Sequence, residues 1–158
     1  MKKTLSLLVI LALVFSFVGC AGPSGGGAKD DILIGVSIWS STDTLGSQVK
    51  EMIDAAAEAL GVKVMYVDQG HISEEVTASM ETLAAAGADG VIICNSSSAE
   101  MTSVINTANE HKVYVAQFFR SISEADNPEE YALAKSSPYY VGAVHEDEID
   151  NGHQLAYT

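Results

Sequence analysis

The strongest constraint in this chain is the alternation between short, β-branched apolar runs and amphipathic helical patterns. The run ILIGVSI from Ile32 precedes a helical pattern that ends at Gly61, and the runs VKVMYV, DGVIIC, VYVAQFF and YYVGAV follow in turn. Alternation of this kind is typical of βαβ units, and runs that are apolar throughout are typical of a parallel sheet covered on both faces. The sequence therefore predicts an α/β fold built on a doubly wound parallel sheet.

The predicted helices carry apolar residues at three- and four-residue spacing, so each should bury one stripe. Gly61 is placed to close the first helix, while Asp43 and Ser73 are placed to cap the first and second. The segment 121–138 is polar and is predicted to be a long loop. The stripe expected to be buried in the first helix consists of Val49, Met52, Ile53, Ala56 and Leu60.

The first residues of the chain indicate export. Lys2 and Lys3 precede an apolar run over 5–18, which is too short for a membrane-spanning helix and is typical of a secretory signal. Small residues flank Cys20, and the arrangement resembles a bacterial lipobox, in which the cysteine is acylated. The Gly- and Ser-rich stretch that follows should act as a flexible tether. The segment therefore predicts a domain that is anchored to a membrane by lipid and does not cross it.

Charge and cysteine content exclude several classes of protein. The 21 Asp and Glu residues outnumber the 8 Lys and Arg residues, so the formal net charge is -13. An anionic surface of this kind repels phosphate backbones, which argues against nucleic-acid binding. With Cys20 assigned to the lipobox, Cys94 has no disulfide partner and is expected to be a small buried residue.

Polar and aromatic residues follow the predicted strands. Because ligands bind at the carboxyl ends of parallel strands, these residues should meet along one edge of the sheet. Hydroxyl, amide and aromatic groups together suit a small polyhydroxylated molecule. Any one of them could equally cap a helix or plug the core, so the prediction rests on their convergence. The candidates are Trp39, Ser41, Thr42 and Asp43 after the first strand, Asn95 after the third, and Gln117, Phe118 and Arg120 in the fourth.

Other motifs leave alternatives open. The stretch SSTDTLGS could hold a phosphate at a helix start, as in flavodoxin-like proteins. The stretch HEDEID, with His153 nearby, could suggest a metal, although acidic residues there also favour the positive end of a helix. No motif for a catalytic nucleophile is present. The sequence predicts neither an enzyme nor a bound metal or cofactor.

Two stretches, IGVSIWSSTDTLGSQVKEMIDAAAEALGVKVMYVDQG and LAAAGADGVIICNSSSAEMTSVINTANEHKVYVAQFF, resemble the sugar-type periplasmic binding proteins, those similar to ribose- and galactose-binding proteins. The resemblance implies two α/β lobes that close on a ligand. It places polar ligand contacts at Thr42 and Asp43, and the family's Asp-Arg pair around Gln117 and Phe118, with Arg120 close by. The family's acidic motif after the fifth strand corresponds to Glu146 and Asp147, preceded by His145. Leu45 and Gly46 stand where many members carry an aromatic pair, which implies a ligand other than ribose.

The resemblance predicts an N-terminal portion of a lipid-anchored, extracytoplasmic solute-binding protein. It would deliver a sugar or similar polar solute to the permease of an ABC transporter. Two alternatives stay open, which are an exported flavodoxin-like or nucleotide-binding enzyme and a ligand sensor subunit of a signalling receptor. The predicted divisions are a signal peptide at 1–19, lipidated Cys20 with its tether at 20–31, a first ligand-binding lobe at 32–144, and a crossover with the start of a second lobe at 145–158.

Overall fold

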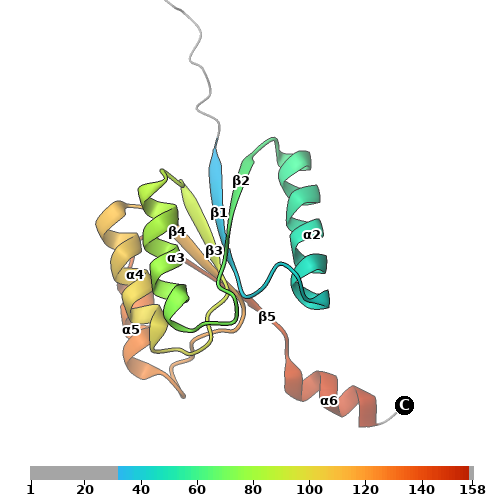
Figure 1. Cartoon of the computed structure of the whole chain (residues 1–158). Coiled ribbons are helices and arrows are strands. Elements are labelled where there is room, and N and C mark those ends of the chain that lie inside the picture. Colours follow the sequence, from blue (N-terminus) through green and yellow to red (C-terminus); the bar gives the residue numbers. More distant parts are fainter. Residues whose placement is uncertain (1–31, 157–158) are drawn as a thin grey trace, which may run out of the picture. The chain divides into compact units, whose positions relative to one another are not determined.

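The computed structural model describes residues 32–156 (Figure 1). The predicted signal peptide at 1–19 and Cys20 with its tether at 20–31 lie outside the described residues. Within residues 32–156, no helix is long and apolar enough to cross a bilayer. The elements are β1 (Leu33–Ile38), α2 (Thr44–Leu60), β2 (Lys63–Asp68), α3 (Glu74–Ala85), β3 (Gly90–Ile93), α4 (Glu100–His111), β4 (Tyr114–Phe119), α5 (Pro128–Ser136), β5 (Tyr140–His145) and α6 (Glu148–Ala156).

The strands form one five-stranded sheet in the order β2-β1-β3-β4-β5, and each neighbouring pair is parallel. Helix α2 lies on one face, and α3, α4 and α5 lie on the other (Figure 1). The predicted doubly wound parallel sheet is therefore confirmed. Because β1 pairs with both β2 and β3, the chain reverses its direction of winding at β1. The point where the strand order reverses is where an open α/β sheet forms its ligand crevice.

The hydrophobic core lies between the sheet and helices α3, α4 and α5. Apolar stripes on α3 and α4 face strands whose side chains on that side are also apolar, so both partners lose solvent contact. Cys94 is buried at the end of β3, as the sequence predicted, and burial raises the pKa of its thiol to about 11. The largest contributors to this core are Val76, Met80, Leu83, Val91, Ile93, Met101, Val104, Ile105 and Val115.

The opposite face is covered less completely among the described residues. Apolar side chains of β3, β4 and β5 border a cavity of about 420 Å³ beside α2. Met52, Ala56 and Leu60 of α2 were expected in the core, but Ala56 is exposed, and Met52 and Leu60 are 72% and 75% exposed. That expectation is wrong because no described element packs over this side of α2. The apolar lining of this cavity includes Val49, Met52, Ile53, Ile92, Phe118 and Val144.

The segment 121–138 corrects a second expectation, because it contains α5 rather than a continuous loop. Pro128 begins the helix, where its missing N–H is not needed, and Glu129 and Glu130 lie in the first turn, where they favour the helix dipole. Only Ala134 of this helix is fully buried. The apolar stripe is therefore too short to stand out in the sequence.

Helix termini otherwise follow the sequence closely. Asp43 caps α2, and its Oδ1 accepts a hydrogen bond from the backbone N–H of Gly46 at 2.7 Å. Gly61 ends α2 with φ 68°, in the left-handed region that glycine enters without penalty. Ser73 precedes α3 as expected, but its hydroxyl makes no capping hydrogen bond. Two of the three expected caps are thus confirmed in full.

Candidate ligand-binding site

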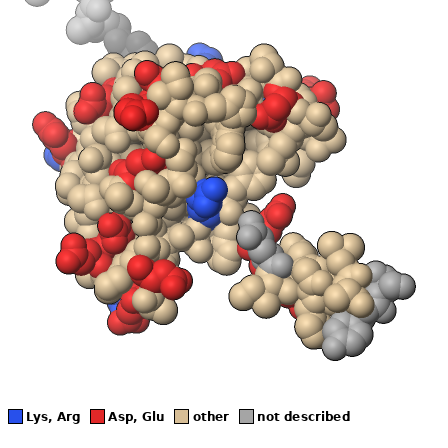
Figure 2. All heavy atoms as spheres, turned by 60° about the horizontal axis from the view of Figure 1, so that its bottom comes forward, with Lys and Arg blue, Asp and Glu red and all other residues tan. Residues whose placement is uncertain are grey.

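The predicted site residues lie where the strands end at their carboxyl termini. Figure 2 looks towards this edge and shows a basic side chain beside a central hollow, with acidic side chains distributed around the face. Two cavities described below open along this edge, and they draw their lining from the segments after β1, β2, β3, β4 and β5. The fold therefore does bring the segments that follow the strands together along one edge of the sheet, as the sequence predicted.

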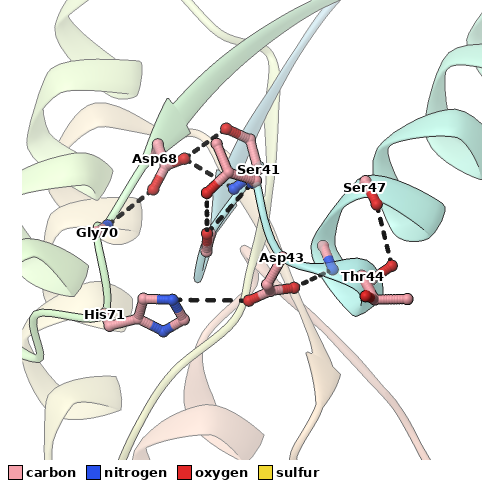
Figure 3. Close-up of polar contacts among 10 residues, drawn as sticks. Ser41, Asp43, Thr44, Ser47, Asp68, Gly70 and His71 are labelled. Carbon is pink, nitrogen blue, oxygen red and sulfur yellow. Dashed lines mark hydrogen bonds and ion pairs between the residues drawn. The ribbon is translucent and has the colours of Figure 1, made fainter.

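The segments after β1 and β2 are joined by the carboxylate of Asp68 (Figure 3). Asp68 Oδ2 accepts from both the backbone N–H of Ser41, at 2.7 Å, and the Ser41 hydroxyl. Asp68 Oδ1 accepts from the backbone N–H of Gly70 at 2.8 Å. These bonds, led by the one from the Ser41 hydroxyl, hold the pKa of Asp68 below its ordinary value. Ser41, a predicted ligand contact, therefore already has its hydroxyl engaged in a link between segments.

Asp43 faces both a helix and a neighbouring loop. Its Oδ1 caps α2, while its Oδ2 lies 3.7 Å from Nε2 of His71 (Figure 3). His71 lies in the left-handed region at φ 63°, which is uncommon for a residue with a side chain. Its ring meets Trp39 edge to face, with 5.5 Å between ring centroids and 84° between ring planes. The sequence did not single out His71, because nothing in its local pattern shows that it reaches across to Asp43.

The Trp39 cavity, of about 400 Å³, opens between these two segments. Trp39 is 40% exposed there, so part of its ring is available to a ligand. Gly46 approaches the backbone closely, because an added Cβ would lie 1.6 Å from the carbonyl oxygen of Ser40. Thr42, another predicted contact, is exposed but does not line this cavity. The lining consists of Ile38, Trp39, Ser40, Asp43, Thr44, Leu45, Gly46, His71 and Phe119.

Asn95 and Gln117, both predicted as ligand contacts, belong to a buried chain of hydrogen bonds beneath the carboxyl-end edge of the sheet. They are 2% and 1% exposed, and Gln117 Nε2 donates to Asn95 Oδ1 at 2.9 Å. Asn95 Nδ2 donates to the carbonyl of Ser97 at 2.9 Å, and the Tyr140 hydroxyl donates to Gln117 Oε1. Only Asn95 also borders a cavity. The structure therefore places Gln117 as a support for the loops, since its side chain faces the core rather than the edge.

The Arg120 cavity, of about 490 Å³, is lined mainly by the segments that follow β3, β4 and β5. Its lining is polar. It brings together four predicted residues, Asn95, Arg120, His145 and Asp147. Asn127 of the segment before α5 also borders it, and its Nδ2 donates to the Ser98 hydroxyl at 2.9 Å. Among the described residues, no three His, Cys, Asp or Glu side chains are arranged to hold a metal ion. The remaining lining residues are Ser97, Ser98, Phe119, Ser121, Glu146 and Ile149.

The two phenylalanines at the end of β4 both line the apolar cavity beside α2, but they differ at the sheet edge. Phe118, a predicted ligand contact, lines the apolar cavity beside α2 and neither of the cavities at the edge. Phe119 lines both the Trp39 cavity and the Arg120 cavity. Phe118 thus stays a predicted ligand contact that borders neither edge cavity, whereas its neighbour Phe119 borders both. Their adjacent positions in the sequence carry no signal that distinguishes them.

Comparison with known proteins agrees with this arrangement. Residues 34–147 match the periplasmic binding protein domain. The ribose import binding protein RbsB of Bacillus subtilis (strain 168) is 29% identical over 131 residues, which cover 78% of this chain and 43% of that protein. This curated relative is thus an import binding protein.

Solved structures show the same fold. A galactofuranose binding protein matches with a TM-score of 0.65 and 20% identity, over 78% of this chain and 38% of its own. The 5-methylthioribose transporter solute binding protein of Thermotoga lettingae TMO matches with a TM-score of 0.62 and 14% identity, over 80% and 37%. GanP, a glucose-galactose binding protein of Geobacillus stearothermophilus, matches with a TM-score of 0.60 and 20% identity, over 82% and 43%.

The chain thus spans less than half the length of each of these relatives. The matched range covers the whole sheet except Leu33, the first residue of β1, and includes both segments that carry Trp39 and Arg120. On the match over residues 34–147, the chain belongs to the periplasmic binding protein domain family.

Proposed function

We propose that residues 32–144 are the first lobe of an extracytoplasmic solute-binding protein that captures a sugar or similar polar solute for an ABC importer. The observation that carries the proposal is the pair of cavities along one sheet edge. One presents Trp39 and Asp43, and the other presents Arg120 with amide and hydroxyl groups. Such a surface combines an aromatic face for C–H groups with donors and acceptors for hydroxyls.

The capture step in this proposal is closure of two lobes around the solute. The relatives RbsB and the galactofuranose binding protein are more than twice as long as the matched region, which leaves room for a second lobe in proteins of this kind. A solute that contacts both lobes shifts the protein towards the closed form. Residues 145–158 would begin the crossover into the second lobe, and the closed form would dock on the permease.

The edge is poorly suited to a phosphate-bearing cofactor, which separates this proposal from a flavodoxin-like enzyme. A phosphate would sit at the N-terminus of α2, where backbone N–H groups and the helix dipole favour an anion. That position is taken by the Asp43 carboxylate, 2.7 Å from the N–H of Gly46. The carboxylate satisfies the N–H group and would repel a second anion.

The membrane anchor belongs to the same proposal. A basic start, a short apolar run and Cys20 among small residues together favour lipidation, and the glycine-rich residues that follow favour a tether. Lipidation at Cys20 would hold the binding lobe close to a permease in the same membrane. It would do so without a membrane-spanning helix.

Calorimetric titration of the full-length protein against ribose, galactose, myo-inositol and allitol tests the binding step. At least one of these solutes should bind, and Trp39→Leu should weaken its binding about tenfold, equivalent to about 1.4 kcal/mol. Asp43→Asn should also weaken binding while keeping the helix cap, because asparagine caps helices as well as aspartate. Tyr114→Leu, at the opposite end of β4, is the matched control and should bind as the wild type does. Absence of binding by all four solutes, or equal affinity in the Trp39→Leu protein, would contradict the proposal.

A further inference from the structure

Phe119 has a backbone conformation that its residue type disfavours. It is the last residue of β4 and has φ 67°, in the left-handed region. A bulky residue is rarely found there, and holding it there costs conformational energy that the surrounding structure must offset. Residues held in this way gather at binding and active sites. The position of Phe119, between two cavities, makes the strained backbone a feature of the candidate site.

The left-handed backbone sets the direction of the Phe119 ring. Successive residues of a regular strand point to opposite faces of a sheet, so Phe118 and Phe119 should not touch. Instead their ring centroids are 4.9 Å apart, with a tilt of 41° between the ring planes. The ring of Phe119 therefore stays near that of Phe118 at the end of the strand, and does not enter the core beside Gln117.

This direction makes Phe119 a lining residue shared by the Trp39 cavity and the Arg120 cavity. Each cavity has its own polar groups, Asp43 and His71 in the first and Arg120 and Asn127 in the second. The side chain of Phe119 has no donor or acceptor. A solute that extends across both cavities thus meets hydrogen-bonding groups on its two sides and an apolar ring between them.

We propose that Phe119 determines specificity, by selecting solutes that place a deoxy, methyl or methylthio carbon, instead of a hydroxyl, against its ring. The inference rests on the proposed function, because it concerns the solute that this site would capture. A hydroxyl placed against the ring would lose water and gain no partner, which disfavours it. An apolar wall rejects an added hydroxyl only moderately, by up to about 100-fold, so the expected preference lies between about 10-fold and 100-fold.

Two matched pairs of sugars probe this preference in the full-length protein. Ribose is compared with 5-methylthioribose, in which a methylthio group replaces one hydroxyl, and galactose is compared with its 6-deoxy counterpart. The affinity ratio within each pair is measured by calorimetry for the wild type, Phe119→Asn and Phe119→Gly. Asparagine and glycine both accept a left-handed backbone, so both variants should fold, and thermal unfolding verifies this. Tyr114→Leu serves again as the control on the same strand.

The wild type should bind the less hydroxylated member of at least one pair about 10-fold or more tightly. Phe119→Asn should bring that ratio close to 1, because its amide can partner the hydroxyl, and Phe119→Gly should weaken the preference by removing the ring. Equal affinities within both pairs in the wild type, or a preference that survives in both folded variants, would overturn the inference and leave the proposed function intact. Failure of the wild type to bind any of the sugars would overturn the proposed function and this inference together.

Discussion

Replacement of Gly46 by alanine should lower the free energy of unfolding by about 2 kcal/mol or more. A Cβ at this position lies 1.6 Å from the carbonyl oxygen of Ser40 and 2.8 Å from its carbonyl carbon. Real Cβ atoms essentially never approach other atoms within 3.0 Å, and both obstacles here belong to the backbone. Either α2 must move away from the sheet or the segment that carries Trp39 must shift.

The magnitude follows from two opposing effects. Overpacking by one methyl group usually costs about 1–3 kcal/mol, and a collision with backbone belongs at or above the upper end of that range. Alanine in place of glycine inside a helix restores at most about 1 kcal/mol. The net loss is a substantial part of the total stability of a typical domain, which is about 5–15 kcal/mol. Gly152→Ala is the matched control, because Gly152 is also helical and an added Cβ there has no atom within 4 Å.

Urea unfolding followed by circular dichroism measures this difference. Trp39 is the only tryptophan of the chain, so its emission in the native state independently reports the position of the segment after β1. Gly46→Ala should shift that emission and lower the urea midpoint, whereas Gly152→Ala should leave the emission unchanged and should not lower the midpoint. If Gly46→Ala unfolds at the wild-type midpoint with unchanged Trp39 emission, then the close approach of α2 to Ser40 is not present in the molecule.

Three further predictions concern other parts of the chain. Because the pKa of Asp68 is lowered in the folded state, its hydrogen bonds stabilise the fold above about pH 4 and are lost as the pH falls through the folded pKa. Asp68→Asn should therefore reduce stability at neutral pH and flatten its loss in acid, and unfolding midpoints from pH 7 to pH 3 that parallel the wild type would contradict this. In a Cys20→Ser variant, the buried Cys94 thiol, with its pKa raised to about 11, should react with iodoacetamide at pH 8 only in urea, and rapid labelling of this variant in its native state would refute the burial of Cys94. Cys20→Ser should release the protein from the membrane fraction of expressing bacteria, and unchanged fractionation would argue against a lipid anchor.

Much of the fold could be predicted because its signals are local. Each strand is a continuous apolar run, and Asp43 and Gly61 stand where a helix begins and ends. Helix α5 escaped prediction because it buries little and begins within a polar segment. Met52 was misplaced for the opposite reason, since an apolar stripe shows only that a surface can be covered. Whether another element actually packs over that stripe depends on parts of the chain that the stripe itself does not describe.

The candidate site was predictable as a place but not residue by residue. The carboxyl ends of the strands do converge, and Trp39 and Arg120 each border a cavity there. Gln117 lies near the carboxyl end of β4, as predicted, but its side chain faces the core. Successive side chains of a strand point to opposite faces of the sheet, and the sequence alone does not say which face each one takes. The position of Phe119 between the two cavities could not be predicted. It depends on a left-handed backbone conformation, and in a residue other than glycine no sequence pattern indicates such a conformation.

The chain of hydrogen bonds from Tyr140 through Gln117 and Asn95 to Ser97 has a consequence for how the lobe meets its solute. It joins the start of β5 through β4 to the segment after β3 before any encounter, so that segment starts from a preorganised geometry. Less conformational entropy is then lost on association, and more of the contact energy remains as affinity. If the proposed function holds, selectivity would come from the fit of this rigid surface, and adaptation would be left to the motion of one lobe against another.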